Sequence, residues 1–200
     1  MFSVRKILLL AFIFIAPISK AQISDFEMGE ARGLFLGLGV GPRFAVGSFA
    51  DNHFFASGFE ATLSYGDNNS IPFFVYGKFN FASFPSEFVD ALDKPSFEIY
   101  TRFFALEPGI RYFFPPISDE VVLLMPFVEG GMNLALVHSG YQLTTGYKTQ
   151  YTEDEFKFGI HAGFGVSMFL LDALISYNYF YEYQFIGFSL RVRIPIFIKI

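Results

Sequence analysis

Apolar and polar residues alternate one by one along eight separate stretches of this 200-residue chain. Within 155–170, for example, Phe158 and Ile160 share one parity and Lys157 lies on the other. A period of two is typical of β-strands, because successive side chains point to opposite faces. The stretches are Arg32–Arg43, 54–66, 72–84, 97–114, 121–138, 155–170, 173–183 and 187–200. The pattern therefore predicts an all-β chain of eight strands.

The connections between these stretches alternate in length. Long polar connections over 43–53, 85–96 and 139–154 follow the first, third and fifth stretches, and short ones follow the second, fourth and sixth. The last link, around 183–186, is short and breaks this rule. An even number of strands with short turns at one end and longer loops at the other is typical of bacterial outer-membrane barrels. We therefore expect an antiparallel up-and-down transmembrane barrel with both termini on the periplasmic side.

The N-terminal segment has the organisation of a secretory signal. Arg5 and Lys6 precede the apolar run 7–16, and small residues follow Pro17. The run is shorter than the ~20 residues of a membrane-spanning helix, and no later run reaches 18 apolar residues. We expect a cleaved signal peptide over 1–21, a short periplasmic segment over 22–32 and a barrel over 33–200, located in the bacterial outer membrane.

A soluble, lipocalin-like barrel shows the same alternation, and the placement of charge decides between the two. Only 16% of the residues are charged and 52% are hydrophobic, whereas a soluble domain has about a quarter charged residues. Within the strands the charges fall on the polar parity together with many glycines, which favours a crowded interior over a solvated exterior. Arg102 and Glu98 are exceptions near a loop, where a long side chain can reach water. The membrane barrel is the better interpretation.

Composition also excludes several classes of function. The chain has no cysteine, so disulfide scaffolds, thiolate metal sites and cysteine nucleophiles are excluded. Its net charge is −5 and it has no basic patch, which argues against a nucleic-acid partner.

Three phrases carry a resemblance to a known family: FFALEPGIRYFFPP at 103–116, PFVEGGMNLAL at 126–136 and GFSLRVRIPIF at 187–197. They resemble the small outer-membrane β-barrel family common in Bacteroidota, whose wider relatives are the OmpA/OmpX-like eight-stranded barrels. The resemblance implies the fold and names no activity. The chain departs from many such barrels in ending Phe197-Ile198-Lys199-Ile200 instead of in an aromatic residue.

No catalytic or metal-binding constellation emerges, and we expect no cofactor. His138 and Ser139 are adjacent, so on a strand they point to opposite faces and cannot form a hydrolase pair. We expect His161 to be a hydrogen-bonding group in the lumen. His53 lacks neighbouring carboxylates at metal-ligand spacing, and Glu153-Asp154-Glu155 lacks the order of a calcium loop.

The charges on the polar parity predict a closed, ion-paired lumen. Eight strands enclose a space that side chains just fill, and an unpaired charge there is costly. Glu107 and Arg111 are four residues apart on one strand, so we expect each to meet a group on a neighbouring strand, such as Glu129 or Lys78. The predicted network comprises Glu60, Lys78, Glu107, Arg111, Glu129, Lys157, Arg191 and Arg193.

The third long connection is the predicted contact surface. Tyr141, Tyr147 and Tyr151 continue the alternation beyond the apolar band, and a turn near 144–147 would join the strands into a projecting ribbon. An exposed ribbon edge can pair with another extended chain. We therefore expect a monomeric structural or surface-interaction barrel whose partners are outer-membrane lipid and a surface or envelope protein bound through 139–154. A narrow transport or ligand-binding barrel and a lipid-modifying enzyme are the alternatives.

Overall fold

The computed structural model describes residues 32–67, 73–86, 96–117, 124–143, 150–168 and 170–199, with side chains for most of them. They belong to the compact unit 31–200. The predicted signal peptide over 1–21 and nearly all of the segment 22–32 lie outside the described residues, so those bounds stay predictions.

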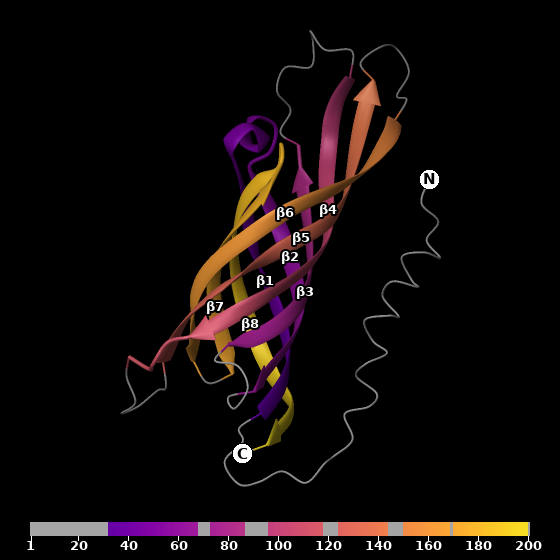
Figure 1. The fold of residues 1–200 in the computed structure, drawn as a ribbon. Coiled ribbons are helices and arrows are strands. Elements are labelled where there is room, and N and C mark those ends of the chain that lie inside the picture. The colour runs from indigo at the N-terminus through magenta and orange to yellow at the C-terminus, as the bar shows by residue number, and fades with distance from the viewer. Residues whose placement is uncertain are drawn as a thin grey trace, which may run out of the picture. The chain divides into compact units, whose positions relative to one another are not determined.

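Eight antiparallel strands form a closed barrel in which each strand pairs with the next and β8 pairs with β1 (Figure 1). The predicted fold class is confirmed. The strands are β1 (Arg32–Val46), β2 (Phe55–Asp67), β3 (Phe74–Pro85), β4 (Ser96–Phe113), β5 (Leu124–Leu143), β6 (Gln150–Met168), β7 (Leu171–Phe180) and β8 (Gln184–Lys199), and a short 3-10 helix, η2 (Gly47–Asp51), follows β1. Among the described residues, no helix is long and apolar enough to cross a membrane.

The barrel closes through the register between its first and last strands. Arg32 pairs with Lys199 at one end and Val46 with Gln184 at the other, with one irregularity between Leu34 and Phe35. Closure removes free sheet edges from the wall, which is the condition for strands to lie in lipid.

The outer wall of the barrel is apolar, as the alternation predicts. Val40, Phe164 and Leu190, from three different strands, are each more than half exposed. Exposed leucine, isoleucine, valine and phenylalanine side chains occur on all eight strands. A surface of this kind is covered by lipid in a transmembrane barrel.

The interior is layered along the barrel axis. At the end where η2 lies, Phe49, Phe84, Phe103, Phe180 and Phe185 pack with small alanines into a buried apolar cluster. The middle holds charged and amide side chains. At the opposite end, Phe35, Phe74, Phe113 and Phe127 form a chain of ring contacts with centroids 5.3–5.9 Å apart.

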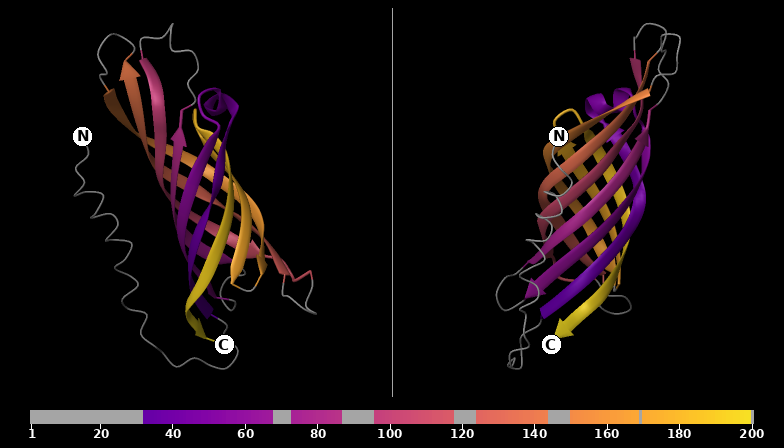
Figure 2. Two further views of the ribbon diagram at one scale, coloured as in Figure 1. Left: turned by 180° about the vertical axis from the view of Figure 1, so that it is seen from behind. Right: turned by 90° about the vertical axis from the view of Figure 1, so that its right-hand side faces the viewer.

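Three strands extend beyond the others at the outer end. β4, β5 and β6 contain 18, 20 and 19 residues, and their ends rise past their neighbours (Figure 2). β5 and β6 stay paired as far as Gln142 and Gln150, so the predicted ribbon exists and only 144–149 lies outside the described residues. The first connection is shorter than predicted, because β1 continues past Arg43 to Val46.

The strand order predicts which connections face the cell exterior. Peptide tags inserted after Asn52, in the β1–β2 connection, and within 144–149 should be labelled on intact cells. A tag within 118–123 should be labelled only after the outer membrane is permeabilised. Labelling of the 118–123 tag on intact cells would contradict this orientation.

Candidate functional site

The middle of the lumen is filled by carboxylates and cations from seven of the eight strands. Strand geometry aims these side chains inward, since each lies on the parity opposite to the exposed apolar residues. Four buried carboxylates face five arginine or lysine side chains, all at most 9% exposed. They are Glu60, Glu107, Glu129 and Asp172, with Arg43, Lys78, Arg111, Arg191 and Arg193.

Glu60 on β2 lies between two arginines. Arg191 of β8 donates from Nε and Nη2 to Oε1 at 2.8 and 2.6 Å, and Arg43 of β1 donates from Nη2 to Oε2 at 3.3 Å. The Ser189 hydroxyl donates to Oε2 at 3.0 Å. This carboxylate ties together the two strands that close the barrel.

Glu129 on β5 is the second centre of the network. Arg111 of β4 donates to its Oε2 from Nε at 2.9 Å and also from Nη2, and Lys78 of β3 donates to Oε1 at 3.2 Å. Arg191 approaches it from the opposite wall, with Nη1 3.6 Å from Oε2. Charge-assisted hydrogen bonds of this kind are the strongest that side chains make.

Lys78 links the two carboxylates of neighbouring strands. Its Nζ lies 2.8 Å from Glu107 Oε2, and the Asn80 amide donates to Glu107 Oε1 at 2.8 Å. Glu107 thus meets Lys78 and Asn80 on β3, and Arg111 meets Glu129 on β5, so the two have different partners on strands adjacent to their own, as their spacing indicates.

Asp172 and Arg43 belong to the network but are absent from the sequence-based set. Asp172 Oδ2 lies 3.3 Å from Arg111 Nη1 and 3.9 Å from Arg191 Nη1, and its Oδ1 lies 3.8 Å from Arg193 Nη2. Arg43 is the last residue of the first predicted stretch, and Asp172 immediately precedes the predicted stretch 173–183, so alternation is hard to read at both positions. The signal in the sequence is parity. Asp172 has the parity of Ser176, and Arg43 has that of Gly41, which is the polar parity of each strand.

Lys157 differs from the prediction. It contacts Glu155 at 2.8 Å and Glu182 at 3.3 Å and is only partly buried. The reason is height along the barrel: Lys157 lies on β6 beyond Gly159, where pairing with β7 begins, so it is above the buried layer. All other members of the predicted network are in the lumen.

His161 occupies a hydrogen-bonded chain in the lumen. Its Nε2 lies 2.6 Å from the Tyr76 hydroxyl, its Nδ1 contacts Asn133 Oδ1, and the Asn133 amide donates to Asn178 at 3.2 Å. These hydrogen-bonded groups fill the space beside the ion pairs.

The groups considered for catalysis are kept apart. His138 Nδ1 is 2.6 Å from Asp154 on the outward face, whereas the Ser139 hydroxyl is buried and 3.1 Å from that of Thr101. His53 is stacked on Phe49 with ring centroids 4.5 Å apart. Among the described residues, no group of three or more histidine or acidic side chains could hold a metal ion.

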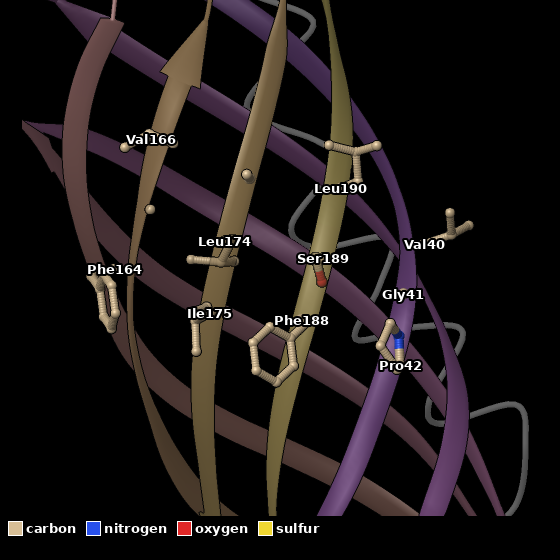
Figure 3. A pocket seen from close by; sticks show the side chains of 12 residues that line it. Val40, Gly41, Pro42, Phe164, Val166, Leu174, Ile175, Phe188, Ser189 and Leu190 are labelled. Carbon is tan, nitrogen blue, oxygen red and sulfur yellow. The ribbon is translucent and has the colours of Figure 1, made fainter.

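A groove on the outer wall is lined by β1, β6, β7 and β8. Phe164, Ile175 and Phe188 form its sides, with Pro42 and the backbone of Gly41 at one edge (Figure 3). No charged side chain lines it. The groove can contact lipid hydrocarbon, and its lining suggests neither catalysis nor metal binding.

Of the third connection, Tyr141 and Tyr151 are paired and their rings stack, 5.1 Å apart and 15° from parallel. Tyr147 lies outside the described residues. β6 pairs with β7 only from Gly159 onward, so no described strand pairs with the second edge of Gln150–Phe158.

Several solved structures are similar to this chain. Neisserial surface protein A is 16% identical over 82% of this chain and 97% of its own, with a TM-score of 0.46. Ail, the attachment invasion locus protein of Yersinia pestis, is 15% identical over 84% of this chain and 100% of its own, with a TM-score of 0.43. A structure of Ail with the heparin analogue sucrose octasulfate has a TM-score of 0.44, with 16% identity over 84% of this chain and 100% of its own. No family model and no curated protein sequence matches the chain.

Removing one member of a lumen pair should be more damaging than removing both. Lys78→Met leaves Glu107 without its cation and should lower the free energy of unfolding by about 3–5 kcal/mol. Adding Glu107→Gln should restore much of that loss. Urea unfolding of the refolded protein in detergent micelles measures both.

Lys157→Met is the matched control for that experiment, because its ion pairs are partly exposed and should contribute at most about 1 kcal/mol. A double variant less stable than Lys78→Met would refute the ion-pair interpretation.

The filled lumen should not conduct ions. A continuous water path would have to cross both the apolar cluster and the paired charges. Purified protein in planar bilayers should give no steady single-channel steps at neutral pH. Stable steps that depend on the amount of folded protein would show that the lumen is open.

Proposed function

We propose that this protein is a structural or surface-interaction barrel of the bacterial outer membrane, in the small family common in Bacteroidota. In this proposal it is exported with a cleaved signal peptide, acts as a monomer without enzymatic activity, and binds a surface or envelope protein through its β5–β6 ribbon. The observation that carries the proposal is the edge of Gln150–Phe158, which no described strand covers.

The composition of this edge favours one class of partner. Glu153, Asp154 and Glu155 are consecutive, and Lys157 is the one cation near them on β6. Backbone N–H and C=O groups along an open edge can accept an added strand, and side chains then select its sequence. An extended segment rich in lysine or arginine would complement this edge.

The lumen supports an anchoring role better than transport. Its mid-section is occupied by salt bridges of 2.6–3.3 Å between strands, and its outer end by aromatic rings. A rigid, filled barrel holds the ribbon at a fixed height above the membrane. In this role the apolar outer wall of the barrel is surrounded by outer-membrane lipid.

Site-specific photo-cross-linking in living cells tests the contact surface. A photoreactive phenylalanine analogue at Tyr151 should give cross-linked protein products on the cell surface. The same analogue at Phe54, an exposed ring in the β1–β2 connection, is the matched control and should give none.

Charge reversal distinguishes a specific edge contact from chance proximity. Glu153→Lys should weaken the Tyr151 cross-link several-fold if the partner segment is basic, since like charges on paired strands repel. Equal products at Tyr151 and Phe54, or products unaffected by Glu153→Lys, would contradict the proposal.

A further inference from the structure

Three titratable side chains lie side by side on the outward face of the long strands. The register pairs Arg102 of β4 with His138 of β5, and His138 with Asp154 of β6. Two residues away from each of them, on the same face of the same strands, are Phe104, Leu136 and Phe156. These apolar side chains are 41–59% exposed, so on these three strands the apolar wall gives way to the row Arg102–His138–Asp154.

Arg102 differs from the other cations whose side chains the structure describes. Arg32, Arg43, Lys78, Arg111, Lys157, Arg191 and Arg193 each have a carboxylate within 4 Å. Arg102 is exposed and, among the described side chains, has no such partner. Its guanidinium lies over the Tyr100 ring, 4.4 Å from the centroid.

A chain of contacts holds the Tyr100 ring in place. His138 Nε2 lies 3.3 Å from the Tyr100 hydroxyl, and His138 Nδ1 lies 2.6 Å from Asp154 Oδ1. With Nδ1–H donating to the carboxylate, Nε2 accepts from the tyrosine. Asp154, His138 and Tyr100 thus fix a flat platform beneath the guanidinium, and the N–H groups of Arg102 stay free of any described carboxylate.

We propose that Arg102 binds the phosphate of an outer-leaflet lipid headgroup, with Tyr100, His138 and Asp154 as positioning residues. Three features favour this ligand. Lipid phosphates lie just beyond the hydrocarbon, and the row is where the apolar wall of these strands ends. A guanidinium supported on an aromatic ring presents its donors as a planar fork that matches phosphate oxygens. Finally, an exposed arginine on a lipid-facing surface meets headgroups before any protein.

This inference is independent of the proposed protein partner. The edge contact uses backbone groups on the side of Gln150–Phe158 that faces away from β5, whereas the phosphate ligand is Arg102 on the outward face of β4. Asp154 of β6 only positions the ring beneath that guanidinium, so Arg102→Gln removes the phosphate ligand and leaves the β6 edge unchanged.

The absence of tryptophan from the chain allows a local test. Phe104→Trp places a single fluorophore two residues from Arg102 on the same face. The variant is reconstituted in phosphatidylcholine vesicles that contain a minor fraction of brominated phosphatidic acid or, in parallel, brominated phosphatidylcholine. Bromine quenches only nearby tryptophan, so the ratio of the two quenching constants reports the preference for the anionic headgroup at this position.

We expect the fluorophore of Phe104→Trp to show a preference of about fivefold for phosphatidic acid, the enrichment that one interfacial arginine provides. Phe188→Trp on β8, across the barrel, is the matched reporter and should show no preference. In the Phe104→Trp background, Arg102→Gln should abolish the preference and Arg102→Lys should keep part of it. Tyr100→Leu should lower the preference although the charge is retained. Unheated gel mobility verifies that each variant is folded.

The inference would be overturned by equal quenching by both lipids in Phe104→Trp, by a preference that persists when Arg102→Gln is added, or by the same preference in Phe188→Trp. The acidity of the chain, −5 in total, disfavours a general attraction to anionic lipid. Inorganic phosphate, compared with chloride at equal ionic strength, separates the two sources of phosphate. A preference that inorganic phosphate abolishes but chloride does not would show that the site takes the free ion as readily as the headgroup, which would overturn the assignment to lipid.

Discussion

The pairing of β1 with β8 is the constraint on which the rest of this structure depends. Once Arg32–Val46 meets Gln184–Lys199, every strand has two neighbours, so the paired part of the wall presents no backbone edge to the hydrocarbon. Closure also fixes the size of the interior. Side chains on the inward parity are then confined to the lumen, so their charges and hydrogen-bonding groups must find partners within the barrel.

That confinement explains the sorting of the interior. Glu60 contacts arginines that are 17 and 131 residues away along the chain, yet all three lie in one layer because the closing strands bring them to one height. Two arginines and Ser189 satisfy its oxygens, which is what a buried carboxylate requires. The aromatic layer above excludes water from the pairs and strengthens them, since the local dielectric falls. The ion pairs and the aromatic layer are consequences of the same packing.

Much of the fold could be predicted from the sequence, because its period of two is a local property. Val40, Phe79, Leu106 and Phe164 are all exposed on the wall, on the parity that alternation indicates. Strand ends are less predictable: Arg43 ends the first predicted stretch although β1 continues to Val46, and Asp172 falls in a predicted link although it belongs to β7. Height along the axis is not a local property either. Lys157 has the parity of the buried charges but lies above them, and only the register with β7 reveals this.

The unequal strand lengths determine where function can be located. β7 ends at Phe180, whereas β6, its neighbour, begins at Gln150, so the wall is high on one side and low on the other. The high side carries both features that the filled lumen cannot supply: an open backbone edge on β6 and, on β4, a cation that no described carboxylate pairs. One feature faces along the sheet and the other faces outward, so a protein strand and a lipid headgroup could occupy them together. A phosphate bound at Arg102 would then fix the height of the ribbon above the membrane, which is the condition for an edge to be accessible from outside.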